Sequence, residues 1–451
     1  MADVNKQSIS QIQLQAFSDL LEEGTLSEVR DKLSTLHASE AALLLESLPP
    51  ETRSTIWELI PHASSGDILL HVNDEVRAEL IRKTDKEKLV AATEKLETDD
   101  LADLIEDLPE IVSREILQSM DKQDRTRLEA VLSYPEDTAG GLMNTDTVTV
   151  RPDISLETVI RYLRFRGELP VNTDNLIVVD RKDNYLGVLS LTKLLTNDQI
   201  LIVADIMNKG FKVIPADQSA KEVAHQFERH DLVSAPVVDE SGKVIGRITI
   251  DDGVDVIRDE ADHSFMRMAG LNEEDDMFAP VVVSSRRRTV WLGVNLITAL
   301  LAASVIGLFD ATIEKMVALA VLMPVVASMG GIAGSQTLTL VIRGMALEQI
   351  GTTNAKILLY KELAVGALNG LIWSLVIAAV TVLWFNDVQL GFIIAFAIMI
   401  NLIVAALAGA TIPMLLRNFN IDPALAGNVV LTTITDVIGF FSFLGLASIF
   451  I

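Results

Sequence analysis

Five long apolar stretches occupy the last third of the chain, and they constrain its fold more than any other feature. They span 290–309, 316–342, 363–385, 388–416 and 424–451, the last interrupted only by Asp436. Each approaches or exceeds the roughly 20 residues with which a helix crosses about 30 Å of hydrocarbon. One such stretch is also typical of a buried core helix, but five in series predict a membrane domain of five helices, 290–451.

Charge separates this membrane part from the rest. Residues 290–451 hold 5 Lys or Arg and 7 Asp or Glu, so −23 of the formal net charge of −25 falls in residues 1–289. Such an acidic surface repels nucleic acid and favours cations or basic partners, although acidity also simply keeps a soluble domain dispersed. Cysteine is absent, which excludes disulfides and thiolate metal sites.

Basic residues indicate the orientation of the spans. They gather before the first span and on alternate connections, at Arg286–Arg288, Arg343, Lys356, Lys361 and Arg417. The positive-inside rule then predicts a multi-pass protein of the cell inner (plasma) membrane, with the N-terminus cytoplasmic and the C-terminus outside. The opposite connections include Asp310 and Glu314, which are candidates for the outer mouth of a transport path.

Asp436 points most directly to a function. It lies 12 residues past Ala424, about 18 Å along a helix and therefore near mid-membrane. A carboxylate there is expensive and by default marks an ion path. A salt bridge has no partner, because no Lys or Arg falls within the five stretches, but a protonated packing group is an alternative. Asn428, Thr432 and Asp436 stand at i, i+4 and i+8 and line one helix face as a polar track.

The second span contains Pro324 and the glycine-rich run Ser328–Gln336. This composition predicts an interrupted helix, which membranes tolerate only where protein or a water-filled cavity satisfies the backbone. The alternative is close helix packing through small residues.

The first 138 residues predict an acidic all-α domain. The segment Ala41–Pro49 recurs as Leu101–Pro109, a near-repeat at an offset of 60 with apolar residues at helical spacing. Stacked helical hairpins, a small superhelical solenoid, are the architecture that such a repeat favours.

Residues 139–260 contain a second repeat. Leu142–Asn144 and Val148–Asp153 recur as Ile206–Asn208 and Val213–Asp217, and a helix and β-rich runs follow in both copies. This pattern resembles a tandem pair of α/β CBS domains, 139–200 and 201–260. The resemblance implies an adenine-nucleotide site, with ATP as ligand and with Thr249 and Asp252 of the second copy meeting the ribose. The first copy has Lys193 in place of that aspartate.

A stripe of carboxylates follows the second copy and continues into a connecting helix, 261–289. Asp252, Asp255, Asp259 and Asp262 stand at i, i+3, i+7 and i+10, on one helix face. Like charges at this spacing destabilise a helix unless something neutralises them. The stripe is either a solvated charged face or a site for a divalent cation, which prefers hard carboxylate oxygens.

The order of these parts resembles the MgtE family of magnesium transporters. The motifs that carry the resemblance are Tyr134–Met143, the Gly-Gly-x-x-Gly-x-Gln run of span two, and Asp422-Pro423-Ala424 followed by Asn428 and Asp436. The resemblance implies a homodimer in the lipid bilayer, with a pore in which Asp436 and Asn428 hold hydrated Mg²⁺. It also implies regulatory magnesium sites at Asp231, Asp252, Asp255 and Glu260, with Asp422 meeting the connecting helix. Ile332 departs from the family pattern, in which asparagine follows the two glycines.

Together these features predict a channel-like transporter that takes up Mg²⁺ and that intracellular Mg²⁺ closes. Mg²⁺ is then both substrate and regulator. The alternatives are a CBS-regulated transporter of another divalent cation such as Co²⁺, and a membrane-tethered metal sensor without transport. An anion transporter is disfavoured because the spans lack Lys and Arg. No catalytic cluster is evident in the sequence, so an enzyme is not expected.

Overall fold

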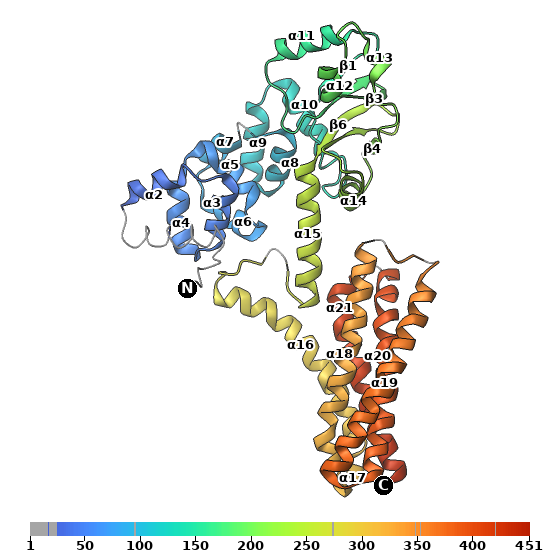
Figure 1. Cartoon of the computed structure of the whole chain (residues 1–451). Coiled ribbons are helices and arrows are strands. Elements are labelled where there is room, and N and C mark those ends of the chain that lie inside the picture. Colours follow the sequence, from blue (N-terminus) through green and yellow to red (C-terminus); the bar gives the residue numbers. More distant parts are fainter. Residues whose placement is uncertain are drawn as a thin grey trace, which may run out of the picture. The chain divides into compact units, whose positions relative to one another are not determined.

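The computed structural model describes residues 17, 25–93, 96–272, 275–347, 349–351, 353–419 and 421–451. The chain divides into two compact units. Unit 1 comprises residues 1–261 and 274–279, and unit 2 comprises residues 262–273 and 280–451. Figure 1 shows both units.

Short helices form the first part of unit 1, as the near-repeat predicts. They are α2 (Leu26–Leu33), α3 (Ala38–Glu46), α4 (Pro50–Leu59), α5 (His62–His71), α6 (Asp74–Lys83), α7 (Lys86–Thr93), α8 (Thr98–Asp107), α9 (Glu110–Ser119) and α10 (Lys122–Val131). Side-chain oxygens cap several of them, such as that of Asn73, which accepts from the Val76 amide. The helices pack as neighbours two apart, α3 on α5, α5 on α7 and α7 on α9, which is the contact pattern of a solenoid.

The remainder of unit 1 contains two small α/β modules with the same topology. The first has β1 (Thr149–Val150), α11 (Leu156–Arg166), β2 (Asn175–Val179), β3 (Tyr185–Ser190) and α12 (Leu191–Thr196). The second follows α13 (Val203–Ile206) and has β4 (Ile214–Pro215), α14 (Ala220–His230), β5 (Ser234–Val238) and β6 (Val244–Thr249). Each sheet pairs its first two strands in parallel and its last two antiparallel. The sequence repeat is therefore a structural repeat.

The helical part and the second module share one hydrophobic core. Leu104 of α8 and Phe227 of α14 are fully buried members of the same cluster. Backbone hydrogen bonds from Ala139 and Gly140 to the β4–α14 segment support this packing. A long helix, α15 (Ile250–Met268), follows β6 directly.

Unit 2 contains five helices long and apolar enough to cross a membrane, among the residues described. They are α16 (Val281–Gly307), α18 (Ala318–Ala346), α19 (Ala355–Phe385), α20 (Val388–Asn418) and α21 (Pro423–Phe450), with the short α17 (Asp310–Lys315) between the first two. Helices α18 to α21 lie side by side (Figure 1), and α20 packs against the other three. The five-span prediction is confirmed.

The glycine-rich run does not interrupt its helix. Helix α18 is continuous from Ala318 to Ala346, with Pro324 inside it, so the predicted break is wrong. The small residues instead allow close packing. A Cβ added at Gly334 would lie 2.8 Å from Leu431 of α21, and one at Gly409 of α20 would lie 2.7 Å from the Gly334 carbonyl oxygen. The packing alternative is the one that the structure supports.

Candidate ion path and acidic cluster

The polar track of α21 lies along a face that the described chain leaves open. Asn428 and Thr432 are exposed and Asp436 is half-buried, whereas their neighbours Gly427, Leu431 and Thr435 are buried against other helices. Thr432 satisfies its hydroxyl on its own helix, donating to the Asn428 carbonyl at 2.7 Å. Asp436 has no ion pair within the described part of the chain.

A second polar face, on α18, lies next to this track. The Ser335 hydroxyl donates to Oδ1 of Asn428 at 3.1 Å, so the two helices meet there. On α18 an open hollow is lined by Gly331, Ile332, Ser335, Gln336 and Thr339. Sequence reasoning singled out this segment as a break but missed its polar side chains. The i, i+4 spacing of Ser335 and Thr339 is the signal that could have found them.

One further membrane carboxylate escaped prediction. Glu362 of α19 is 4% exposed. It accepts from the Thr337 hydroxyl at 3.2 Å and pairs with Lys361 at 2.8 Å. The sequence reading assigned this pair to a connection, whereas α19 begins earlier, at Ala355.

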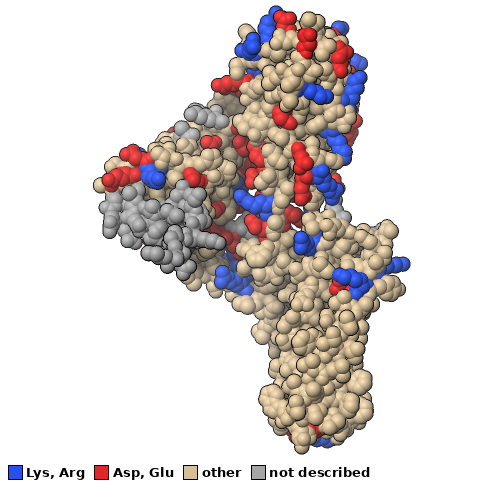
Figure 2. Space-filling view, in the orientation of Figure 1, with Lys and Arg blue, Asp and Glu red and all other residues tan. Residues whose placement is uncertain are grey.

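Figure 2 shows one face of unit 2, on which charged side chains are almost absent between the two ends of the long helices. The outer-mouth candidates Asp310 and Glu314 are exposed on the short helix α17. That helix packs against both α18 and α21. The two acids therefore stand at one end of the helices that carry the polar faces.

Unit 1 contains an acidic cluster that the sequence reading recognised only in part. Carboxylates from the start of α8 interact electrostatically with carboxylates at the start of α15. Together these carboxylates form an acidic cluster, which comprises Glu97, Asp99, Asp100, Asp103, Asp251 and Asp252. Asn144, 1% exposed, joins the α8 part by donating its amide to Glu97 and, at 3.2 Å, to Asp99.

The electrostatics of this cluster are unfavourable without a counter-ion. Burial, and then repulsion from Glu97 and Asp251, raise the pKa of Asp99 to about 6. Burial, and then repulsion from neighbouring aspartates, raise the pKa of Asp100 to about 7. Burial and the nearby Asp99 raise the pKa of Asp252 well above its ordinary value. Close carboxylates in a desolvated place hold protons in this way unless a cation replaces them.

The four residues expected at regulatory magnesium sites have different surroundings. Asp252 lies in the acidic cluster and accepts from the Thr249 amide at 3.0 Å, while Asp255 is exposed on α15. Asp231 adopts a left-handed backbone at the end of α14. Glu260 forms an ion pair with Lys221 of α14. No described group of three or more acidic or histidine residues is arranged so that it could hold a metal ion directly.

Asp422 belongs to unit 2 and caps α21. Its carboxylate accepts from the Ala424 amide at 2.8 Å, which anchors the first turn of α21. Oδ2 of Asp422 also lies 3.5 Å from Nε2 of His263, in the last part of α15 that belongs to unit 2. Asp422 therefore contacts His263, which lies in the segment 261–289 that the sequence predicts as the connecting helix.

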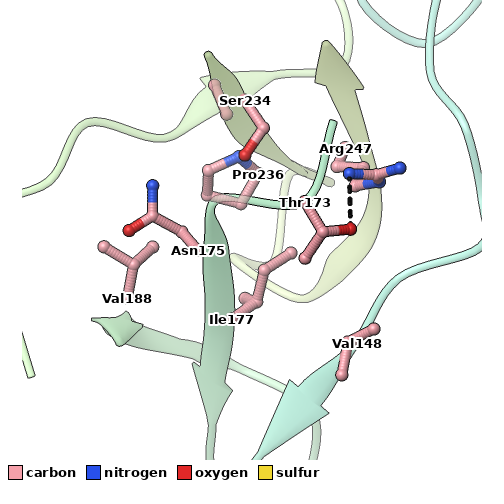
Figure 3. Close-up of a pocket in the computed structure, with 9 residues that line it drawn as sticks. Val148, Thr173, Asn175, Ile177, Val188, Ser234, Pro236 and Arg247 are labelled. Atoms are coloured by element: carbon pink, nitrogen blue, oxygen red, sulfur yellow. Dashed lines mark hydrogen bonds between the residues drawn. The ribbon is translucent and has the colours of Figure 1, made fainter. Parts of the chain in front are cut away.

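The cleft between the two α/β modules is nearly filled (Figure 3). Its cavity of about 10 Å³ is lined by residues of β2, β5 and β6, and so holds about one water molecule. The buried Arg247 crosses it, donating to the Thr173 hydroxyl at 3.3 Å and to the Val171 carbonyl at 2.7 Å. The predicted nucleotide residues Thr249 and Asp252 are hydrogen-bonded to each other beside β6.

Family models match three regions of the chain, and two relatives match it over most of its length. Residues 36–137 match the MgtE intracellular N domain, 139–199 and 203–259 match CBS domains, and 323–446 match the MgtE divalent cation transporter family. The chain is 31% identical to "Magnesium transporter MgtE" of Thermus thermophilus over 96% of its own length and 97% of the relative's. It is 29% identical to the Bacillus subtilis protein of the same name, with 96% of each covered.

A solved structure is also similar to the first part of the chain. It is titled "Crystal structure of the cytosolic domain of the Mg2+ channel MgtE in complex with ATP". It is 32% identical, covers 54% of this chain and 99% of its own, and has a TM-score of 0.49. The relatives that match over most of the chain are named as transporters, not as enzymes.

Proposed function

Because the chain belongs to the MgtE family of magnesium transporters, we propose that it takes up Mg²⁺ along the polar faces of α18 and α21. We further propose that cytoplasmic Mg²⁺ closes this path by binding the acidic cluster. The observation that carries the transport proposal is the half-buried Asp436, without an ion pair in the described chain, on an open helix face deep in a membrane domain. Such a carboxylate is retained for an ion.

The donor set suits a hydrated magnesium ion. Mg²⁺ gives up its waters reluctantly and prefers near-octahedral oxygen surroundings. Asp436 offers one carboxylate per chain, and Asn428, Thr432 and Ser335 offer amide and hydroxyl groups that bond well to coordinated water. A hydrated ion needs such outer contacts more than a closed cage of carboxylates.

A homodimer would complete the path. The open faces of α18 and α21 leave the polar residues of one protomer exposed. A second copy placed about a two-fold axis would oppose two Asp436 carboxylates, giving the site two negative charges for one divalent ion. Dimerisation would also remove these polar groups from contact with lipid, where unsatisfied polar groups are costly.

The proposed orientation has the soluble unit in the cytoplasm and the C-terminus outside. Arg286–Arg288 lie in the first turns of α16, Arg343 in the last turns of α18, and Arg417 in the last turn of α20. Because successive helices alternate in direction, these basic residues belong to the same membrane side, which the positive-inside rule assigns to the cytoplasm.

The acidic cluster suits a regulatory divalent cation. Its hard carboxylate oxygens have raised pKa values, which indicate uncompensated negative charge. Because no described group of acidic residues is arranged to hold a metal ion directly, these carboxylates would hold Mg²⁺ through its coordinated waters. Mg²⁺ bound there would hold α8 against the start of α15, and its loss would leave repulsion to separate them. ATP is proposed as a second ligand, with Thr249 and Asp252 toward its ribose, and it would need the cleft of Figure 3 to widen.

Reconstitution into liposomes tests the proposal. A trapped Mg²⁺ indicator should report uptake from the outside, and uptake should stop as Mg²⁺ on the side of unit 1 rises into the millimolar range. Faster Co²⁺ than Mg²⁺ flux would favour the other divalent cation as substrate. If the protein binds metal but carries no flux, it is a membrane-tethered metal sensor and not a transporter.

A further inference from the structure

A buried asparagine at the back of the pore helices has no part in the proposed path. Asn401 of α20 is 0% exposed. Its amide Nδ2 donates to the Val326 carbonyl of α18 at 2.8 Å. Its Oδ1 is buried without a hydrogen-bond partner among the described residues. An arrangement of this kind calls for an explanation other than stability, because an unsatisfied buried acceptor is costly.

Two glycines make room for this side chain. A Cβ added at Gly330 of α18 would collide with the Asn401 amide. A Cβ added at Gly439 of α21 would lie 2.7 Å from Nδ2 of Asn401. The asparagine therefore sits directly between the backbones of the two helices that carry the proposed path, and contacts both.

The rise per residue of an α-helix places Asn401 and Asp436 at about the same depth in the membrane domain. Gln389 of α20 donates to the Phe450 carbonyl of α21, so these two helix ends lie side by side. Asn401 lies 12 residues beyond Gln389, and Asp436 lies 14 residues before Phe450. At about 1.5 Å per residue, the two are about 18 and 21 Å from the same end. Gly439 is also less than one helical turn from Asp436.

We infer that Asn401 is a positioning residue for the ion path. Asn401 is hydrogen-bonded to the Val326 carbonyl and lies between Gly330 and Gly439. These contacts set the spacing of α18 and α21 at the level of Asp436. This inference rests on the proposed function. A fixed spacing matters most for Mg²⁺, which demands nearly ideal octahedral geometry, and less for Ca²⁺, which accepts flexible coordination. Asn401 thus determines ion discrimination through helix spacing, without touching the ion.

The test compares Mg²⁺ and Ca²⁺ flux in liposomes for the full-length wild type and Asn401→Leu. Leucine has the same branched shape, with four heavy atoms in the side chain, and removes both the hydrogen bond and the unpartnered Oδ1, so thermal stability should not fall. The ratio of Mg²⁺ to Ca²⁺ flux should fall about 2- to 10-fold, the effect of losing one net hydrogen bond. An unchanged ratio, or a loss of thermal stability with the ratio intact, would overturn the inference.

A matched control is Thr381→Val in α19. Thr381 is also 0% exposed, and its Oγ1 also lacks a partner in the described chain, but it is on a different helix. Its variant should keep the wild-type flux ratio. An equal change in this control would show that any lost buried polar atom alters discrimination, which contradicts a specific role for Asn401.

A second variant covers the case in which Asn401→Leu does not fold. In Asn401→Ala with Gly330→Ala, the new methyl group enters the space that the amide leaves, without its hydrogen bond. This pair should fold and still show the lowered ratio, and a wild-type ratio would refute the role of the hydrogen bond. If the wild type itself carries no Mg²⁺, the proposed function fails instead, so the two failures are distinguishable.

Discussion

Replacing Asp99 by asparagine should stabilise the chain without divalent cations and weaken its response to Mg²⁺. Asp99 is 9% exposed and lies in the acidic cluster, where it accepts from the Asn144 amide. Asparagine preserves the side-chain shape and the accepting oxygen but removes the charge. The variant therefore removes repulsion and a magnesium-binding group in one change.

The size of each effect follows from the electrostatics. The pKa of Asp99 is about 6 against an ordinary 3.8, which corresponds at pH 8 to about 3 kcal/mol against the charged form. Removing that charge should raise the melting temperature of unit 1 in chelator by up to about 6–12 °C, at about 2–4 °C per kcal/mol. A bound Mg²⁺ at a hundredfold excess over its Kd stabilises by about 2.7 kcal/mol, and the variant should lose much of this gain.

The assay is thermal unfolding of the purified full-length protein, followed in chelator and in millimolar Mg²⁺. The control is Asp153→Asn, which removes an exposed carboxylate outside the acidic cluster. The wild type and the control should gain stability with Mg²⁺, and Asp99→Asn should start higher and gain little. A lower melting temperature for Asp99→Asn in chelator would refute the idea that these carboxylates repel one another.

Three further predictions concern the pH dependence of the acidic cluster, the buried Arg53 and the gating of transport. Because burial raises the pKa values of the acidic cluster above those of the unfolded chain, stability in chelator should fall as pH rises from about 4 through about 7, as pH-dependent melting would show. Arg53→Met should destabilise unit 1 by about 3–5 kcal/mol in denaturant titrations, because the fully buried Arg53 pairs with Glu79 at 2.6 Å and Asp276 at 2.9 Å. Asp252→Asn with Asp255→Asn should keep transport open at Mg²⁺ concentrations that close the wild type, measured by patch recording with stepped internal Mg²⁺.

The fold was predictable where its signals are local. Apolar length identified the five spans, and the internal repeats identified the solenoid and the paired α/β modules. Helix ends were less predictable, because a membrane helix continues beyond the apolar stretch. Helix α19 begins at Ala355, eight residues before the apolar stretch that starts at Leu363.

The glycine run was misread for a physical reason. Glycine weakens an isolated helix, but close contact with a neighbouring helix outweighs that weakness. Gly330 and Gly334 lie against Asn401 and Leu431, where larger residues would collide. The sequence of α18 alone does not show that Asn401 and Leu431 of other helices lie against these glycines.

The shared face of the polar track on α21 was predictable from the sequence, and the acidic cluster was less so. Asn428, Thr432 and Asp436 share a face because they share a helix period. Asp99 approaches Asp252 although more than 150 residues separate them, and one sequence gives no signal for such a pairing. Likewise, the ion pair of Glu260 with Lys221 depends on how α14 packs beside α15.

The central claim is that Mg²⁺ passes Asp436, and flux through Asp436→Asn tests it most directly. Asparagine keeps the shape of the side chain. The control is Thr433→Val on the same helix but outside the polar track, because the Thr433 hydroxyl donates to the Val429 carbonyl of its own helix. In liposomes containing correctly folded protein, Asp436→Asn should reduce Mg²⁺ uptake at least about tenfold, as the loss of a mid-membrane charge demands, while the control transports normally. Uptake by Asp436→Asn at the wild-type rate would contradict the account.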